Sequence, residues 1–574
     1  MVDKSLATLK DVFRIAFFQK AQVLIFLFGA SLAAITEMAF LGLLYAVFSV
    51  DKAMAVLGWV KSKIYFNPAQ SSFLDKNIIY ILIACGVAML FLRLFFAILG
   101  RFALARVQVR TSVKLSKELL SAFVDAHPMA WVSWKRERIV HILAYETGIS
   151  GEVIYTALNM LMSLMVMSAL LTGSFLISVK LTIFSLLIGI IVLGINYTNY
   201  LKAKSIGVVK NKSKAQLLGN VYDIVCGHKI LKLEGGEGFA KTRSSGVISD
   251  SYSWVLGKAK NINTVMSFSE LFIYFFFFGL VLMGHIFKIA DQATLLTLLI
   301  ISIRLQGSVG QLQNQWLTYQ ELLPNFLDVR KAIFHARDFT IKEKIRPLTA
   351  IKRGGMTVRL DGLNFAYTDG GPGIIKDLDI VFPGGRKILI KGKSGSGKST
   401  FINMVSGMLQ QASGKIFYDD EELTAESFYH FRRLVSYSSP DAYIFKGTIK
   451  SNISLGLDKS DDEILGCAKQ AGLEEFMKKL ENGIYSTVVD NAANISLGER
   501  QRLMLARMFL KKPRLILLDE ATSNLDLELE DKILKNLIEH LPEATLIMVT
   551  HRAPKNFIFD KMFELKDGKL VGLT

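Results

Sequence analysis

Residues 392–399 read Gly-Lys-Ser-Gly-Ser-Gly-Lys-Ser, which is a complete phosphate-binding loop. An apolar run from Lys387 to Ile390 precedes the loop and predicts a strand, and Thr400–Leu409 follows it and predicts a helix. Strand, glycine-rich loop and helix in this order form the context in which the pattern is credible. Because glycine tolerates unusual backbone angles, the loop can wrap around a polyphosphate with its N–H groups pointing inward. The sequence therefore predicts a nucleotide-binding site.

Two side chains of the loop have separate expected roles. Lys398 would reach the β- and γ-phosphates, and the Ser399 hydroxyl would hold Mg²⁺. The predicted nucleotide-binding residues of this segment are Gly392, Lys393, Ser394, Gly395, Ser396, Gly397, Lys398, Ser399 and Thr400.

Two later strands end in residues that suit phosphate chemistry. Leu515–Glu520 reads Leu-Ile-Leu-Leu-Asp-Glu, a buried strand with two carboxylates at its end. We expect Asp519 to hold Mg²⁺ and Glu520 to polarise the attacking water. A second apolar strand, Thr545–Val549, places His551 where it would contact the γ-phosphate.

An aromatic residue precedes the phosphate-binding loop. The alternation of Met356–Tyr367 predicts two short strands that end at Tyr367. Its ring would either stack on an adenine base or pack in the core.

The composition indicates a membrane protein. Hydrophobic residues make up 51% of the chain, and the mean hydropathy of +0.35 is too high for a soluble protein of this size. The net charge of +18 would suit nucleic acid, but its placement argues against such a partner. Lys and Arg number 8 in residues 101–150 and 11 in residues 201–260, against 6 in the expected outer loops. This asymmetry places both long loops in the cytoplasm.

Six segments are apolar enough to be membrane spans of about 20 residues. They are residues 22–48, 78–99, 153–179, 181–200, 264–284 and 292–310. The long connections are polar but periodic, so we expect the helices to extend into the cytoplasm and to turn at short crosswise helices, His127–Trp134 and Cys226–Glu234. Residues 1–20 predict an amphipathic helix on the membrane surface, and residues 53–66 predict either an outer helix or a loop.

Four ionisable residues lie in or near the apolar spans, namely Glu37, Arg93, Glu270 and Arg304. Because a charge inside a membrane is costly, each should face the bundle interior or a cavity. They would either form interhelical pairs, such as Glu37 with Arg93, or contact a substrate. Three widely spaced cysteines, Cys85, Cys226 and Cys467, should be free thiols.

These motifs, taken in order, resemble the ATP-binding cassette (ABC) family. The matching elements are Tyr367, Gly392–Ser399, the signature Ser496–Gln501, Leu515–Glu520, the D-loop Ser523–Asp526 and His551. The resemblance implies an all-α transmembrane domain of six helices with the ABC exporter fold (residues 1–335), followed by an α/β P-loop nucleotide-binding domain (residues 336–574). Together they resemble a half-size ABC exporter.

The same resemblance implies a dimer that sandwiches two ATP molecules with Mg²⁺. Each site would combine the phosphate-binding loop, Asp519, Glu520 and His551 of one subunit with the signature of the other. The residues expected to act across the dimer are Ser496, Gly498 and Glu499, and Asp526 would be the D-loop residue. The helix that follows the signature would offer its partly positive N-terminus to the γ-phosphate.

Two positions depart from the family pattern. Pro440 stands where the family usually has a glutamine that ligates Mg²⁺ and senses the membrane domain. Ser439 and Asp441 are the neighbouring candidates to act in its place. Leu497 makes the signature bulkier at the expected dimer interface. Because Glu520 and His551 are present, we expect a working but slow ATPase.

The expected function is ATP-driven export or flipping of an amphipathic substrate by a homodimer. The membrane half is similar to lipid-linked oligosaccharide flippases at Glu37, at the outer helix, and at Arg93 and Arg304. A peptide is the alternative cargo. Membrane lipids would be further partners. The protein would lie in the bacterial inner membrane, with its nucleotide-binding domain in the cytoplasm. The alternatives are an ATP-gated membrane regulator with poor transport coupling and a half-transporter that needs a different partner chain.

Overall fold

The computed structural model divides the chain into two compact units. One contains residues 1–124 and 134–336, and the other contains residues 125–133 and 337–574. The residues that the structure describes are 11–49, 54, 68–132, 134, 136–180, 182–183, 213, 216–287, 292–339, 354–367, 371–410, 412–440, 442–488, 494–522 and 525–573.

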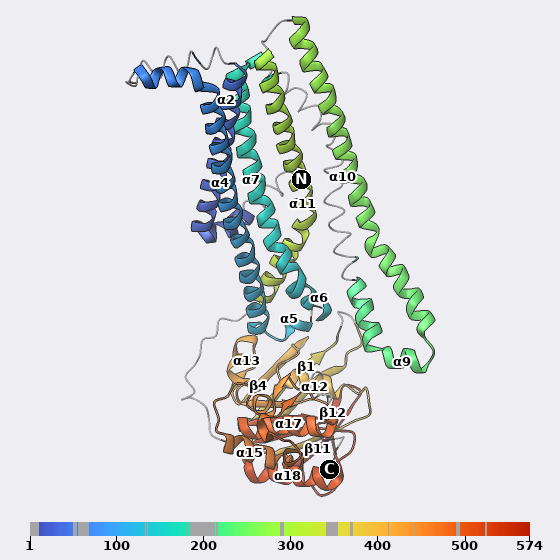
Figure 1. Cartoon of the computed structure of the whole chain (residues 1–574). Coiled ribbons are helices and arrows are strands. Elements are labelled where there is room, and N and C mark those ends of the chain that lie inside the picture. Colours follow the sequence, from blue (N-terminus) through green and yellow to red (C-terminus); the bar gives the residue numbers. More distant parts are fainter. Residues whose placement is uncertain are drawn as a thin grey trace. The chain divides into compact units, whose positions relative to one another are not determined.

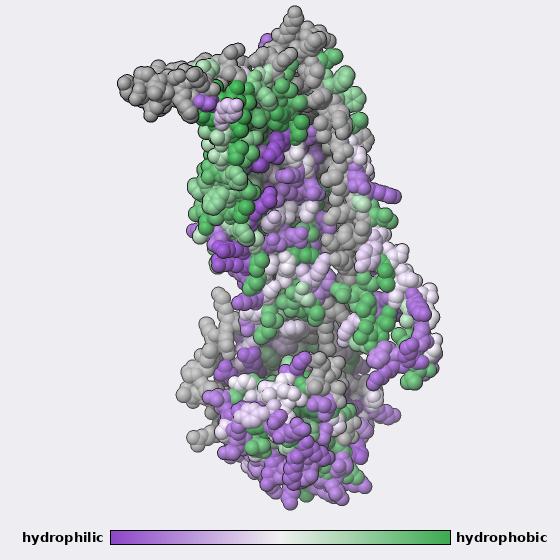
Figure 2. Space-filling model, in the orientation of Figure 1, coloured by the Kyte–Doolittle hydropathy of each residue, from purple (hydrophilic) through white to green (hydrophobic). Residues whose placement is uncertain are grey.

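The first unit is made of long helices (Figure 1). In chain order these elements are η1 (Phe17–Gln19), α2 (Lys20–Phe48), α4 (Pro68–Asp125), α6 (Arg136–His141), a π-helical turn η2 (Ile142–Glu146), α7 (Thr147–Ile177), α9 (His228–Leu233), α10 (Glu237–Phe287) and α11 (Gln292–Asp338). Figure 2 shows hydrophobic residues gathered over the upper part of α2, α4 and α7.

Four helices in the described part of the chain are long and apolar enough to cross a membrane. They are Asp11–Phe48, Asn77–Asp125, Arg138–Ile177 and Ala293–Asp338. These helices contain the first, second, third and sixth predicted spans almost completely. The fifth predicted span, residues 264–284, lies within α10. The fourth span and the segment 53–66 fall almost wholly outside the described residues.

Small residues let the helices approach closely. A Cβ atom on Gly151 of α7 would lie 2.1 Å from the Ser112 hydroxyl oxygen and 2.6 Å from the Gln108 carbonyl oxygen of α4. A Cβ on Gly29 of α2 would lie 3.0 Å from the Phe96 carbonyl oxygen of the same neighbour. The sequence therefore needs glycine where α4 meets α7, because any larger side chain would have to displace backbone.

The N-terminal segment packs against α4. Val12 and Ala16 are buried. The Gln19 amide donates to the Val107 carbonyl oxygen at 3.3 Å and to the Thr111 hydroxyl at 3.2 Å. The apolar face predicted for residues 1–20 is thus covered by protein over these positions, and residues 1–10 lie outside the described part.

The second unit is a layered α/β domain that also contains the short helix α5 (Met129–Val132). Its strands are β1 (Val358–Phe365), β2 (Ile375–Phe382), β3 (Lys387–Lys391), β4 (Ser413–Tyr418), β5 (Glu421–Glu422), β6 (Val435–Ser438), β7 (Gly447–Thr448), β8 (Thr487–Val488), β9 (Leu515–Asp519), β10 (Thr545–Val549), β11 (Lys561–Lys566) and β12 (Lys569–Leu573). Its helices are α12 (Lys398–Val405), α13 (Ala425–Phe431), α14 (Ile449–Ser454), α15 (Asp461–Gln470), α16 (Glu474–Lys478), η4 (Gly483–Tyr485), α17 (Leu497–Lys511) and α18 (Leu527–His540).

A six-stranded sheet in the order β12-β11-β3-β10-β9-β6 positions the site. Strand β10 pairs in parallel with β3 and with β9, so Val549 lies opposite both Ile390 and Asp519. The carboxyl ends of β3, β9 and β10 therefore meet at one edge, which is where open α/β sheets bind ligands. Apolar clusters cover both faces of this sheet, one including Phe509 of α17 and the other Phe401 of α12.

Two details of the predicted secondary structure were wrong. Residues 358–365 form one strand rather than two, because an irregularity in register near Gly362 (φ +56°) lets a single strand continue through a bulge. Helix α12 ends at Val405 rather than near residue 409, because Gly407 takes a left-handed conformation (φ +79°) that stops it.

Short helices occur at both predicted cytoplasmic turns, as α5 and α9.

Candidate active site

The phosphate-binding loop is shaped by its glycines and held by its lysine. Gly395 and Gly397 have φ values of +80° and +96°, which residues with a Cβ rarely adopt. The Lys398 ammonium donates to the carbonyl oxygens of Gly392 and Lys393, both at 2.8 Å. Because Lys398 is buried, its charge is fixed inside the loop that is expected to hold phosphate.

Asp519 offers two unsatisfied oxygens at the end of β9. Its side chain is 1% exposed, and neither carboxylate oxygen has a hydrogen-bond partner among the described residues. Burial raises the pKa of Asp519 and the Glu520 carboxylate adds to the rise, whereas the Ser399 hydroxyl and Lys398 oppose it. A buried carboxylate without a partner is costly, and hard oxygen atoms are what Mg²⁺ prefers. Asp519 and Ser399 therefore fit a magnesium ion.

Glu520 and His551 lie together at the carboxyl ends of β9 and β10. The Nδ1 atom of His551 is 3.5 Å from the Oε1 atom of Glu520, and the two side chains are 61% and 31% exposed. Glu520 has a φ of +50°, an uncommon conformation for a residue with a side chain. Its N–H group donates to the Val549 carbonyl oxygen at 2.9 Å, which fixes the turn. The arrangement leaves a carboxylate accessible to water beside an imidazole.

Tyr367 lies beyond the end of β1 with an exposed ring. It is 64% exposed, and its hydroxyl is 3.0 Å from the Thr400 hydroxyl on α12. The ring meets Phe365 edge-on, with 5.0 Å between centroids. This exposure disfavours the core interpretation and leaves the ring available for stacking.

The signature residues cap helix α17. The Ser496 hydroxyl accepts from the Glu499 N–H at 3.3 Å, and the Glu499 carboxylate accepts from the Ser496 N–H at 2.8 Å. This reciprocal cap satisfies two backbone donors of the first turn. Leu497, the residue that makes the signature bulkier, is 46% exposed.

The D-loop and the proline position flank this edge of the sheet. The Asp526 carboxylate caps α18 by accepting from the Leu529 N–H at 2.8 Å, whereas residues 523 and 524 lie outside the described part. Pro440 is partly exposed two residues beyond β6. The buried Ser438 hydroxyl at the end of β6 has no hydrogen-bond partner among the described residues.

The fold brings together one half of the predicted site. The phosphate-binding loop, Asp519, Glu520 and His551 share the carboxyl edge of the sheet. Within the described residues, no hydrogen bond or ion pair joins Ser496, Gly498 or Glu499 to this group. The signature is therefore not part of the same cluster within one chain.

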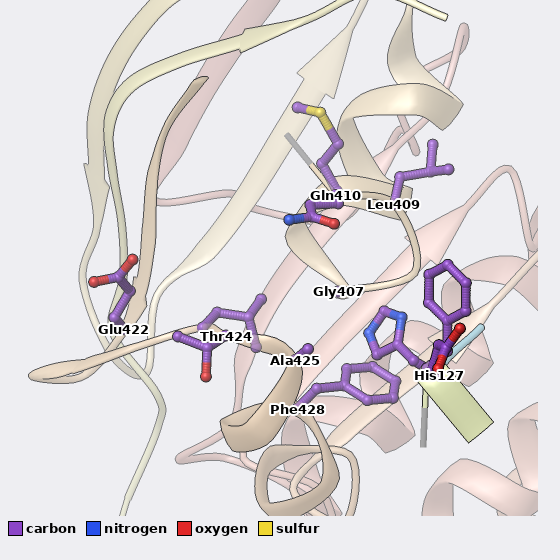
Figure 3. A pocket seen from close by; sticks show the side chains of 12 residues that line it. His127, Gly407, Leu409, Gln410, Glu422, Thr424, Ala425 and Phe428 are labelled. Atoms are coloured by element: carbon purple, nitrogen blue, oxygen red, sulfur yellow. The ribbon is translucent and has the colours of Figure 1, made fainter. Parts of the chain in front are cut away.

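Sequence reasoning missed a cavity beside His127, which lies two residues before the crosswise helix α5. Within the second unit, the His127 ring lies 4.7 Å from the Phe428 ring of α13, and the Tyr429 hydroxyl donates to the Asp125 carbonyl oxygen at 2.5 Å. Figure 3 shows His127 and Phe428 beside a cavity of about 270 Å³, which Gly407 and Glu422 also line. The aromatic sequence Ser-Phe-Tyr-His-Phe at 427–431 was the available signal.

The charged residues of the spans also come together. Glu37 of α2 is 3.2 Å from Arg93 of α4 and 3.2 Å from Arg304 of α11. The proposed pairing of Glu37 with Arg93 is therefore present, and Arg304 shares the same carboxylate. The side chain of Glu270 lies outside the described part of the structure.

Fold and site define an ABC transporter nucleotide-binding domain that follows a helical transmembrane domain. Residues 375–523 match the protein family described as ABC transporter. This segment contains the phosphate-binding loop, the signature and the Asp519–Glu520 pair, so the chain carries an ABC transporter ATPase domain.

Known proteins show similar sequence and fold. The mitochondrial iron-sulfur clusters transporter ATM1 of Chaetomium globosum is 33% identical over 258 residues, which is 44% of this chain and 42% of that protein. The multidrug resistance-like ATP-binding protein MdlB of Buchnera aphidicola is 29% identical over 307 residues, 54% of this chain and 50% of that protein. The chain thus spans about half the length of these relatives, or slightly less.

A solved structure resembles nearly the whole chain. It is a bacterial Atm1-family ABC exporter with ATP bound, with a TM-score of 0.79 and 19% identity, covering 95% of this chain and 94% of that one. The chain therefore has the Atm1-family exporter fold, in which a helical membrane domain is followed by an α/β nucleotide-binding domain.

Proposed function

We propose that this protein is an ATP-driven exporter or flippase for an amphipathic substrate, working as a homodimer in the bacterial cytoplasmic membrane with its cassette in the cytoplasm. The observation that carries the proposal is the cluster at the carboxyl edge of the sheet, which contains Lys398, Asp519, Glu520 and His551. The same chain contains helices that are long and apolar enough to cross a membrane. A lipid-linked oligosaccharide is the first candidate cargo, and a peptide is the second.

The residues of the site would have separate roles in binding and hydrolysing ATP. Lys398 and the loop N–H groups would bind the phosphates, and the exposed Tyr367 ring would stack on adenine. Asp519 and Ser399 would hold Mg²⁺, which when bound neutralises phosphate charge and orients the phosphates. Glu520 would orient water and accept its proton, and His551, 3.5 Å away, would position the γ-phosphate.

A dimer would complete the site. Because Ser496 lies at the N-terminus of α17 and outside the cluster of its own chain, a second copy would supply it, with Gly498 and Glu499. The helix N-terminus would then add a partial positive charge near the γ-phosphate. Helix α9 supports the same arrangement, because none of its residues is buried and Leu233 is 85% exposed.

The test is ATP hydrolysis by the purified chain in nanodiscs, with lipid-linked oligosaccharides and membrane-active peptides added separately. We expect Mg²⁺-dependent turnover that one class of compound stimulates, and a fall of at least about 100-fold in Glu520→Gln. Glu539→Gln is the matched control, because it makes the same chemical change at an exposed carboxylate of α18 outside the site. Turnover equal in wild type and Glu520→Gln would refute the proposal.

One observation favours a second function, an ATP-gated membrane regulator with weak transport coupling. Pro440 lies two residues beyond β6, at the position where the ABC family usually has a glutamine that ligates Mg²⁺ and senses the membrane domain. A proline can do neither, because it has no polar side-chain group. Pro440→Gln distinguishes the two functions. In a regulator it would create stimulation by a compound that leaves the wild-type rate unchanged.

A further inference from the structure

One buried carboxylate joins the loops that follow β9 and β10. Glu530 lies in the first turn of α18 and is 3% exposed. Its Oε1 atom accepts from the Thr522 hydroxyl at 2.6 Å, and its Oε2 atom accepts from Nη2 of Arg552 at 3.3 Å. Thr522 lies two residues after Glu520, and Arg552 directly follows His551. Both loops of the candidate active site are thus tied to the same side chain.

The backbone at Glu520 is anchored on both sides. Its φ of +50° is uncommon for a residue with a side chain and persists only where the surroundings enforce it. On one side, the Glu520 N–H donates to the Val549 carbonyl oxygen at 2.9 Å. On the other side, Ala521 and Thr522 are buried, and the Thr522 hydroxyl donates to Glu530. Glu530 therefore supplies a polar anchor on the C-terminal side of Glu520.

The turn that carries His551 is tied to Glu530 as well. The Thr550 hydroxyl donates to the Arg552 carbonyl oxygen at 3.0 Å and accepts from the Arg552 N–H at 3.2 Å, which closes a turn around His551. The His551 side chain is 61% exposed, so packing does little to fix it. The Arg552 guanidinium then joins this turn to Glu530. The position of the imidazole therefore depends on that ion pair.

We propose that Glu530 is a positioning residue for ATP hydrolysis, which keeps Glu520 and His551 at their working distance. The Nδ1 atom of His551 and the Oε1 atom of Glu520 are 3.5 Å apart. Within the described residues, the Glu530 side chain forms hydrogen bonds only with Thr522 and Arg552, so it acts through them. A misplacement of about 1 Å can cost about 100-fold in rate. This inference rests on the proposed function, because it needs ATP hydrolysis at this site.

A carboxylate suits this position because both neighbours can donate. Thr522 offers a hydroxyl and Arg552 a guanidinium, and an ionised carboxylate accepts from both. In Glu530→Gln, one amide oxygen remains as an acceptor, and the charge that attracts Arg552 is lost. The amide has nearly the size of the carboxylate. The variant therefore weakens the link between the two loops without opening a cavity.

The test is ATP hydrolysis by the full-length chain in nanodiscs. Rates are expressed per nucleotide-binding site, counted by titration with a fluorescent ATP analogue, so that unfolded protein is excluded. Glu530→Gln should lower kcat about tenfold and leave the KM for ATP within about twofold, because the lost contact acts on the hydrolytic step. Glu539→Gln makes the same change at an exposed position of α18. It is the matched control and should leave both constants unchanged.

A second comparison separates positioning from general stability. In a Glu520→Gln background, the carboxylate that Glu530 positions is already absent. Glu530→Gln should then lower the residual rate by less than about threefold, because two groups that act as a unit have non-additive effects. A variant that only loosened the nucleotide-binding domain would lower the residual rate by the same factor as in the wild type.

Thr522→Val breaks the same link and keeps Glu530 itself. It removes the hydroxyl with little change in size, and should lower kcat about fivefold, the equivalent of one hydrogen bond, with an unchanged KM. Added to Glu530→Gln, it should lower kcat by less than about twofold more, because the link is already broken. If Glu530→Gln does not fold, Thr522→Val alone decides, through its own effect on kcat.

Two results would overturn the inference. In the first, Glu520→Gln is slow, but Glu530→Gln and Thr522→Val hydrolyse ATP at the wild-type rate. In the second, Glu530→Gln lowers the rate by the same factor in the wild type and in the Glu520→Gln background. Equal turnover of wild type and Glu520→Gln would refute the proposed function and the inference with it, so the two kinds of failure are distinguishable.

Discussion

The two crosswise helices α5 and α9 have similar predicted roles and different surroundings. Each follows a polar stretch that the sequence predicts to extend a membrane span, and each is only four to six residues long. The α5 segment packs within its own unit, where His127 meets Phe428 and the Tyr429 hydroxyl bonds to Asp125. No residue of α9 is buried, and Ile230 and Leu233 are 68% and 85% exposed.

The difference between α5 and α9 indicates which of the two helices finds its contacts within one chain. A helix of one or two turns is not stable alone, so α5 and α9 need tertiary contacts. The cassette of the same chain supplies those contacts to α5. We infer that a second subunit supplies them to α9, since exposed leucine and isoleucine on so short a helix indicate an interaction surface. Four substitutions test this difference between α5 and α9.

The largest expected effect is at Phe428. This side chain is 8% exposed, and its ring packs edge-on against the His127 ring. Phe428→Ala should cost about 3 kcal/mol through lost packing and an unfilled cavity, which corresponds to about 100-fold more frequent opening of the α5 segment. Hydrogen exchange of residues 127–132 measures it, and Phe428→Leu should show a much smaller change. Unchanged exchange in the alanine variant would show that α5 does not depend on α13.

The second largest effect, on ATP hydrolysis, is expected from a substitution at Leu233. If α9 is buried against a second subunit, Leu233→Asp places a charge in an apolar contact, and ATP hydrolysis should fall about tenfold or more because burying an unpaired charge is expensive. Leu233→Met keeps size and polarity and should retain activity. Lys229→Asp introduces the same charge on α9 at an exposed polar position and should have little effect. Equal activity of Leu233→Asp and wild type would contradict the role of α9.

A smaller effect should depend on pH at His127. Burial lowers the pKa of His127 below its usual value of 6.5, so the folded segment binds fewer protons than the open one. The neutral His127 therefore contributes its full stabilisation above about pH 7.5, and this contribution is lost as the pH falls below 6.5. At pH 5.5 the segment should open up to about tenfold more often than at neutral pH. The Asp338 and Glu422 carboxylates line the same cavity. His127→Phe keeps an aromatic ring there and should remove the pH dependence, which hydrogen exchange at matched pH would show.

The smallest effect is expected at Tyr429. Tyr429→Phe removes only the hydroxyl that donates to the Asp125 carbonyl oxygen. The loss of one such bond should cost about 1 kcal/mol, or about fivefold in local opening. The expected change is confined to residues 125–132. Faster exchange throughout the cassette would instead indicate a general loss of stability, and the bond would not be specific to α5.

Local sequence determined most of the nucleotide site. A phosphate-binding loop, a strand ending in Asp519 and Glu520, and a strand before His551 are each short patterns with a fixed chemical meaning. Parallel pairing of β3, β10 and β9 then places their ends together. The sequence did not show that Asp519 would have two unsatisfied oxygens or that Glu520 would take a positive φ, because both depend on how neighbouring strands surround these residues.

Other features were decided only by the tertiary structure. From the sequence, Glu37 was a partner for Arg93, but three helices far apart in the chain had to meet before Arg304 could share the same carboxylate. Similarly, the sequence placed a crosswise helix after His127 but did not identify Phe428, about 300 residues later, as its neighbour. Motifs and hydrophobic periodicity reflect interactions over a few residues. Ion bridges and docking surfaces reflect packing between distant segments, which no local pattern specifies.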